Sequence, residues 1–258
     1  MMTCKIMNEP KAKVTGVAQL LQVALQAIMQ GELDATLGYH RSKRRAQEEA
    51  KNFRNGYSPR MLHTAFGLIP LAVPRDRLGL YSPNILKRYC RDARGLENKL
   101  LFLFAQETDS STFLEQIRAL YDKVPAREEL EYIGMHLLPA VRAWQMRRLE
   151  RAYSFIALDA IQGQGADDRI AQILIGEGQE GIQEVLSIHI ASRPSFYFWT
   201  ETLADLRARG LEQAPAFCVG CGTGFHQAVH IIFPNQTPVH AEYLPGMEAE
   251  PEAVATKS

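Results

Sequence analysis

The sequence lacks any apolar run that approaches the roughly 20 residues needed to cross a bilayer, so it predicts no membrane span and no membrane partner. Residues 1–14 alternate polar and basic side chains, without the apolar stretch of a secretory signal. Cysteine is scarce, with four residues in the chain, and only Cys218 and Cys221 lie close together in sequence. This usage excludes a disulfide framework and favours a reducing, cytoplasmic compartment.

The charge of the chain is balanced overall but not along its length. The 258 residues carry a formal net charge of zero, and 46% are hydrophobic, as in a globular protein with a sizeable core. Residues 41–94 hold 13 Lys or Arg against four Asp or Glu, a net +9, which leaves −9 for the remainder. Such a basic segment indicates a nucleic-acid partner, although a solvated surface balanced by acidic neighbours explains it equally well. The cations that we expect to contact phosphates are Arg41, Lys43, Arg44, Arg45, Lys51, Arg54, Arg75, Arg77, Lys87 and Arg88.

The first 94 residues are predicted to start with a helix and continue as irregular structure. Residues 17–30 are apolar at helical spacing and predict one amphipathic helix, which ends near Gly31. Residues 52–83 are rich in proline and glycine with short apolar runs between them, so we expect loops and short strands rather than helix there.

Residues 95–150 are predicted to hold three short helices. Residues 96–106 form the first apolar helical segment, and a polar break follows it. Thr112 and Glu115 have the spacing of a capping box, which predicts the start of the second helix, and the third begins after Pro125. Short helices with tight polar turns fit a helix-turn-helix module, and they fit any small helical bundle as well.

The second half changes to strand-like patterns at Tyr153. Apolar strands are expected at 154–161, 169–176, 182–191, 214–220 and 237–243, with helices at 195–210 and 222–233. This order, β-β-β-α-β-α-β, matches a ribonuclease-H-like mixed sheet with flanking helices. The tail after Pro245 has little to bury and is expected to be disordered. The residues expected in the core are Phe155, Ala157, Ile173, Ile175, Leu186, Ile188, Phe198, Trp199, Leu203, Phe217 and Ile231.

Asp159 is the candidate metal ligand, because it ends the first strand of this pattern. Phosphoryl transfer on DNA by such a sheet uses carboxylates at neighbouring strand ends to hold two Mg²⁺ or Mn²⁺ ions. An aspartate at a strand end is also common as a turn or capping residue. The fourth strand ends in Gly220, Cys221 and Gly222. It therefore supplies no carboxylate, and a two-metal site is not completed there.

A second group of candidate ligands lies near the end of the sequence. Cys218, Cys221, His226 and His230 contain residue types that bind zinc, spaced C-x2-C-x4-H-x3-H. The four-residue gap between the pairs is much tighter than the 12 or so residues of a zinc finger. We therefore favour packing of the cysteines in the core and surface positions for the histidines.

Several segments resemble the Mutator-type insertion-sequence transposases, over roughly residues 33–240. The most specific is NFRNGYSP at 52–59, followed by VPRDRLGLYSP at 73–83. GELDATLGYH, LLFLFAQ with SSTFLEQI, AWQMRRLERAYSFIALDAI, FWTETLADLRARGLEQ and GTGFHQAVHIIFPNQTPV resemble the family as well. The resemblance implies an α/β protein with a helical, helix-turn-helix-like front part, followed by a ribonuclease-H-like sheet. It also implies a bacterial, nucleoid-associated location and Mg²⁺ or Mn²⁺ at a DDE set of carboxylates whose first member is Asp159.

The resemblance further implies binding of duplex DNA at element ends and transposition, with homo-oligomers or pairing with an intact transposase as possible assemblies. We expect four regions: a basic DNA-binding region at 1–94, the helical region at 95–150, an incomplete catalytic-type domain at 151–243 and an acidic tail at 244–258. The second aspartate is replaced by Gly220, and the expected glutamate has no counterpart in the printed sequence. The sequence thus predicts a catalytically inactive transposase. The alternatives are a non-catalytic DNA-binding or transposase-inhibiting remnant and the product of a decayed element.

Overall fold

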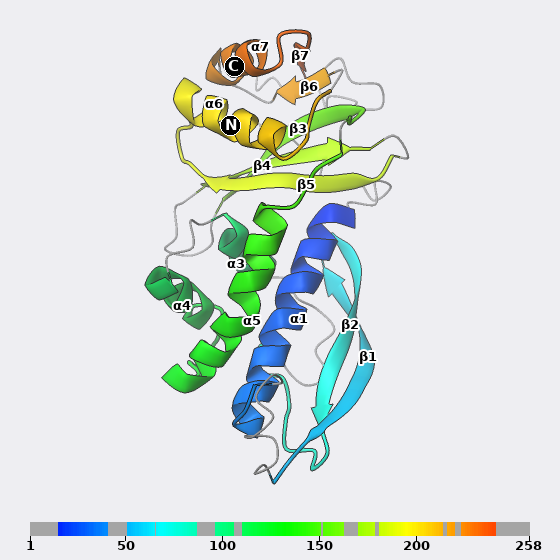
Figure 1. Ribbon diagram of the computed structural model, residues 1–258, viewed down its shortest axis with the longest axis vertical. Coiled ribbons are helices and arrows are strands. Elements are labelled where there is room, and N and C mark those ends of the chain that lie inside the picture. Colours follow the sequence, from blue (N-terminus) through cyan, green and yellow to red (C-terminus); the bar gives the residue numbers. More distant parts are fainter. Residues whose placement is uncertain are drawn as a thin grey trace, which may run out of the picture.

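The computed structural model describes residues 15–40, 51–64, 66–86, 96–105, 110–150, 152–162, 170–178, 181–213, 216–219 and 223–240. The molecule is elongated and mixed α/β: a helical half with a β-hairpin lies at one end, and a five-stranded sheet with two helices lies at the other (Figure 1). The elements are α1 (Thr15–Leu37), β1 (Arg54–Thr64), β2 (Gly67–Asp76), α3 (Glu97–Phe104), α4 (Ser110–Arg118), α5 (Arg127–Gln145), β3 (Phe155–Gln162), β4 (Ile170–Glu177), β5 (Gln183–Ile190), α6 (Phe196–Ala208), β6 (Ala216–Val219), α7 (Thr223–Ile232) and β7 (Thr237–His240).

Helix α1 is the centre of the helical half, where it lies between the hairpin and α5 (Figure 1). The predicted end near Gly31 is wrong, because the helix continues to Leu37 and ends at Gly38, whose φ is +75°. Gly31 instead marks the crossing of α1 and α5. A Cβ at Gly31 would lie 2.3 Å from the Cα of Ile133, so only glycine permits this approach.

Strands β1 and β2 form an antiparallel hairpin that covers one side of α1. Its strands, of 11 and 10 residues, are longer than the short strands predicted from the prolines. Both strands of a two-stranded ribbon are edge strands, where proline is tolerated. Leu62, Ile69 and Leu71 are buried against the helical core. The amides of Gln22 and Gln26 on α1 donate to backbone carbonyls of β2 at 2.7 and 2.6 Å, so polar contacts also hold the hairpin to the helix.

The three predicted helices between residues 95 and 150 are present, with shifted bounds. Helix α4 begins at Ser110, so Thr112 lies inside its first turn instead of at the predicted capping position. Helix α5 is longer than predicted and continues through Pro139 to Gln145, because its buried side packs along α1 and against α4. Whether these helices form a helix-turn-helix module remains a prediction.

The sheet has the strand order β5-β4-β3-β6-β7. β3, β4 and β5 are antiparallel neighbours, whereas β6 runs parallel to β3 and β7 runs parallel to β6. All five predicted strands and both predicted helices of this half are confirmed within a few residues. One face packs against α6 and α7, and the β4 and β5 side chains of the other face join the core of the helical half. The helical half thus shares one hydrophobic cluster with β4 and β5, and a second cluster lies between the sheet, α6 and α7.

Most of the predicted core of this half is confirmed. The residues that are at most 3% exposed are Ala157, Ile173, Ile175, Leu186, Ile188, Trp199, Leu203 and Phe217. Phe155 and Phe198 are only partly buried. The assignment of Ile231 to the core is wrong, because its side chain is 60% exposed. Helix α7 turns Phe225 and Val229 inward, at i and i+4, and this spacing leaves Ile231 on the outer side.

Candidate functional site

The segments 52–59 and 73–83, singled out in the sequence, meet at the base of the hairpin. Asn52 donates its side-chain amide to Asp76 at 2.7 Å, and Asp76 also accepts from the backbone N–H groups of Leu80 and Tyr81 at 2.9 and 3.1 Å. Burial alone would raise the pKa of Asp76, but these hydrogen bonds together lower it. The ionised carboxylate of Asp76 therefore holds the turn that follows β2 through hydrogen bonds.

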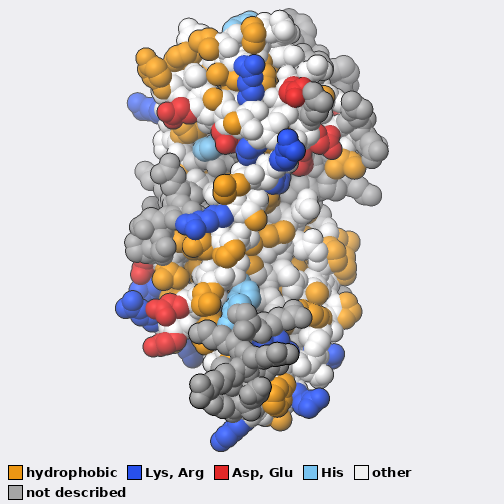
Figure 2. Space-filling view, in the orientation of Figure 1, with side chains coloured by type: hydrophobic (Ala, Val, Ile, Leu, Met, Phe, Trp, Pro, Cys, Tyr) orange, Lys and Arg blue, Asp and Glu red, His pale blue; other side chains and the backbone are white. Residues whose placement is uncertain are grey.

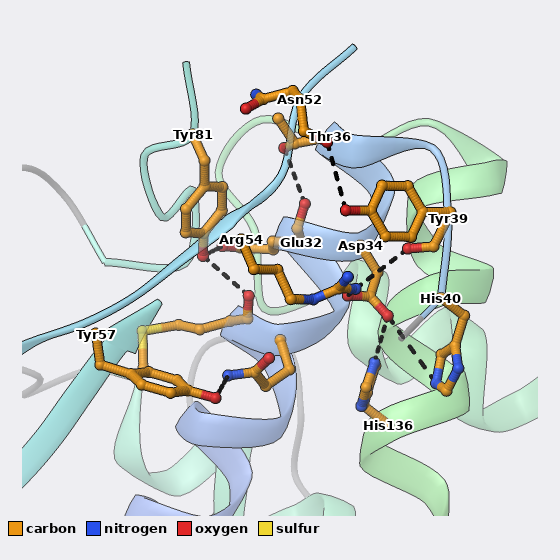
Figure 3. Close-up of polar contacts among 12 residues, drawn as sticks. Glu32, Asp34, Thr36, Tyr39, His40, Asn52, Arg54, Tyr57, Tyr81 and His136 are labelled. Carbon is orange, nitrogen blue, oxygen red and sulfur yellow. Dashed lines mark hydrogen bonds and ion pairs between the residues drawn. The ribbon is translucent and has the colours of Figure 1, made fainter. Parts of the chain in front are cut away.

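Arg54 belongs to this internal network, although the sequence assigned it to phosphate binding. Its guanidinium forms an ion pair with the carboxylate of Asp34, which is 1% exposed, and donates to the backbone carbonyl of Tyr39 at 3.2 Å (Figure 3). It also lies 4.8 Å from the centroid of the Tyr39 ring. Burial alone would raise the pKa of Asp34, but hydrogen bonds and charge from His136 and Arg54 lower it. The Arg54 side chain thus ties β1 to the end of α1.

Glu32 forms a second buried carboxylate site one half-turn before Asp34. Its oxygens accept from the hydroxyls of Tyr121 at 2.8 Å and Tyr81 at 3.1 Å, and from the backbone N–H groups of Asn84 at 3.0 Å and Ile85 at 2.9 Å. The Glu32 side chain is 1% exposed, and burial raises its pKa against these hydrogen bonds. Glu32 therefore connects α1 with the chain after β2, through Tyr81 (Figure 3), and with the chain after α4, through Tyr121.

The other predicted phosphate-binding cations lie partly within the described residues. Lys51, Arg75 and Arg77 are exposed around the base of the hairpin. Arg41, Lys43, Arg44, Arg45, Lys87 and Arg88 lie outside the described residues. On the face shown in Figure 2, described Lys and Arg side chains are spread over both halves rather than gathered in one patch. The role of these cations remains a prediction from the charge of residues 41–94.

Asp159 lies inside β3, not at its end as predicted, because the strand continues to Gln162. It is 4% exposed and pairs across the sheet with Ile173. Its position in the alternation places it with Ile173 on the face opposite α6 and α7. Burial raises the pKa of Asp159 to about 6, and the N–H of Ala160, 2.8 Å from Oδ1, opposes the rise. Among the described residues, no ionised side chain contributes to this shift.

Among the described residues around Asp159, no second carboxylate acts on its pKa, so they do not supply a ligand set for a pair of divalent cations. β6 lies directly beside β3, with Ala157 opposite Cys218. Gly220 itself lies outside the described residues, and glycine has no side chain to offer a metal. Two divalent cations need several oxygen ligands, of which the described residues here supply the carboxylate of Asp159.

The cysteine and histidine set falls on the same part of the chain. Cys218 lies in β6, while His226 and His230 lie in α7. Cys221 lies outside the described residues, so the arrangement of the four side chains is not defined, and the preference against zinc there remains a prediction.

The sequence matches the family model described as "Transposase, Mutator family" over residues 3–240. The chain belongs to the Mutator family of transposases. It is 29% identical, over 83% of its length, to the transposase for insertion sequence element IS1201 of Lactobacillus helveticus. It is 25% identical over 87% of its length to the probable transposase for the ISRM3-like element of Sinorhizobium fredii, and 26% identical over 73% to the transposase for IS256 in transposon Tn4001 of Staphylococcus aureus.

These alignments cover 59%, 57% and 50% of the three relatives, so the Mutator-family chain spans little more than half of their length. Within the described residues, no helix is both long and apolar enough to cross a membrane.

Sequence reasoning missed the buried carboxylates Glu32 and Asp34 and the histidines near them, His40 and His136. The available signal was a pair of acids in GELDATLGYH, directly after an apolar helical stripe. That signal was ambiguous, because acidic residues near the end of an amphipathic helix usually face solvent.

Proposed function

We propose that this Mutator-family chain binds duplex DNA at insertion-element ends through its basic N-terminal region and does not itself cut or join the DNA. The observation that carries the second part is the isolation of Asp159, a buried carboxylate without a second acidic ligand among the described residues around it. A chain that occupies element ends without cutting them would compete with an intact transposase for the same sites.

The sheet supports the assignment of a ribonuclease-H-like domain, which we include in the proposal. Three antiparallel strands are followed by two parallel ones, and the first strand, β3, lies at the centre of the order. Helices α6 and α7 cover one face. Asp159 lies on the opposite face of β3. In such a domain the first metal ligand is expected on the central strand beside β6, which is the strand that carries Asp159.

Binding through phosphates predicts a steep dependence on salt, because each neutralised phosphate releases condensed counterions. Replacing Arg44 and Arg45 together by alanine should weaken binding to all duplex sequences alike and reduce the slope of log K against log salt by about two. Fluorescence anisotropy with element-end and unrelated duplexes, over a series of salt concentrations, measures both quantities.

The matched control is Arg127→Ala, since Arg127 is exposed on α5 and lies outside the basic region. It should leave the affinity and the slope unchanged. An affinity that does not change with salt, or an equal loss in the control variant, would contradict phosphate binding by the 41–94 segment.

The proposed lack of cleavage is tested by nicking of end-containing duplex DNA with Mn²⁺, the more permissive ion. We expect no nicked product above background from the chain or from Asp159→Ala, and none from Gly220→Asp, which restores one carboxylate only. Nicking by the unaltered chain that disappears in Asp159→Ala would show that another acid, with Asp167 and Asp168 the first to test, completes the site.

A further inference from the structure

Asp34, His40 and His136 form a cluster of metal-ligand types outside the region of Asp159. One potential ligand atom from each residue lies within 4.8 Å of the other two. The Nε2 atom of His136 lies 2.9 Å from Oδ2 of Asp34, and the Nε2 atom of His40 lies 3.9 Å from the same oxygen. Figure 3 shows both imidazoles directed at this carboxylate, one from α5 and one from the chain just after α1.

We propose that Asp34, His40 and His136 bind one zinc ion. Two imidazoles and one carboxylate match the preference of Zn²⁺ for nitrogen and oxygen ligands, whereas Mg²⁺ and Ca²⁺ prefer oxygen alone. Three protein ligands leave the fourth tetrahedral position to water. This site is independent of the proposed DNA-binding function.

The geometry requires only small side-chain movements. Ligands of a tetrahedral zinc ion at about 2.0–2.1 Å lie about 3.3 Å from one another. The contacts of His136 and His40 with Asp34, at 2.9 and 3.9 Å, lie on either side of that separation. The imidazole rings are already stacked on one another, with centroids 4.9 Å apart. The side chains of His40 and His136 are 23% and 22% exposed, which leaves an entry path from solvent.

Arg54 orients the carboxylate without blocking the oxygen that faces the histidines. Its guanidinium pairs with Oδ1 of Asp34, while Oδ2 faces both histidines. Ligating carboxylates in zinc proteins are commonly held by such a second hydrogen bond. Bound zinc would join α1, α5 and β1 at one point. It would also fix His40, the residue directly before the basic stretch that begins at Arg41.

The experiment uses the full chain without a polyhistidine tag, freed of metal with a chelator and titrated with Zn²⁺, and in parallel with Co²⁺ as a spectroscopic probe. We expect one equivalent of Zn²⁺ to bind. His40→Ala and His136→Gln should each weaken it at least about 100-fold, since loss of even an outer-shell partner costs 10–100-fold in affinity. The amide nitrogen of glutamine can take the place of Nε2 and still donate to Asp34, so His136→Gln tests the ligand rather than the hydrogen bond. Circular dichroism of each variant checks that the fold is retained.

Two controls separate this site from other places of binding. His63→Ala removes an exposed histidine of β1 and should leave the affinity unchanged. Cys218→Ser with Cys221→Ser should also leave it unchanged, and the Co²⁺ complex should show no thiolate charge-transfer band. The proposal is overturned if no stoichiometric ion binds, if binding survives both His40→Ala and His136→Gln, or if it is lost with the cysteines.

Discussion

Glu32→Gln is expected to destabilise the protein by about 3 kcal/mol, although glutamine has nearly the same shape as glutamate. All four groups that approach the carboxylate of Glu32 act as donors. Ile85 offers its backbone N–H to Oε1, and Asn84 offers its own to Oε2. In either orientation of the glutamine amide, its NH₂ group faces a backbone N–H. A backbone N–H can only donate, whereas a tyrosine hydroxyl can also accept. A buried donor is then left without an acceptor.

The effect is measured by urea unfolding of the two chains at neutral pH. Glu32→Ala removes the acceptor altogether and should cost as much or more, since it orphans all the donors. Glu131→Gln is the matched control, because Glu131 pairs with Arg127 on the exposed side of α5. It should change the free energy of unfolding by less than about 0.5 kcal/mol. A Glu32→Gln protein as stable as the unaltered chain would show that the network reorganises around a neutral side chain.

Asp159→Asn is expected to stabilise the protein, by about 3 kcal/mol at pH 8. Burial raises the pKa of Asp159 from 3.8 to about 6, so ionising the carboxyl costs more in the folded than in the unfolded chain. Each pKa unit corresponds to about 1.4 kcal/mol. Asparagine carries no charge, and its side-chain oxygen can still accept from the N–H of Ala160. The substitution should therefore remove the cost and keep the hydrogen bond.

The pH dependence of this gain has a definite sign. The folded chain binds the Asp159 proton more tightly, so this carboxyl favours the folded state below pH 3.8 and loses that contribution as the pH rises through 6. The advantage of Asp159→Asn should thus shrink from about 3 kcal/mol at pH 8 to below about 1 kcal/mol near pH 4. Thermal unfolding of both proteins across this range measures it.

The control for pH dependence is Glu115→Gln, whose carboxylate is exposed on α4 beside Arg118. This substitution should leave stability nearly unchanged at every pH. A Mutator-family chain in which Asp159→Asn is neutral or destabilising at pH 8 would mean that a cation compensates Asp159. A gain in stability at pH 8 is instead the result expected from the proposed incomplete metal site around Asp159.

The order of helices and strands could be predicted because it depends on patterns local to the chain. The short apolar run in 154–161 and the helical spacing of apolar residues in 195–210 predict β3 and α6 without knowledge of their packing partners. The basic charge of 41–94 and the family motifs are likewise properties of the sequence. The ends of the helices depend on more than local pattern. Gly31 predicts the end of a helix, and only the close approach of Ile133 shows why glycine occupies this position.

The tertiary structure alone decided which charged residues face inward. Arg54 counts as a cation in any sum over the sequence, yet its partner Asp34 lies 20 residues earlier on α1. Glu32 meets Tyr81 and Tyr121 from 49 and 89 residues away, and Asp34 meets His136 from 102 residues away. Periodicity carries no information on such distant pairs. From the sequence, an acidic residue on a helix is expected to face solvent, and only the fold shows the hydrogen-bond donors that allow its burial. The burial that raises the pKa of Asp159 likewise follows from the packing around β3.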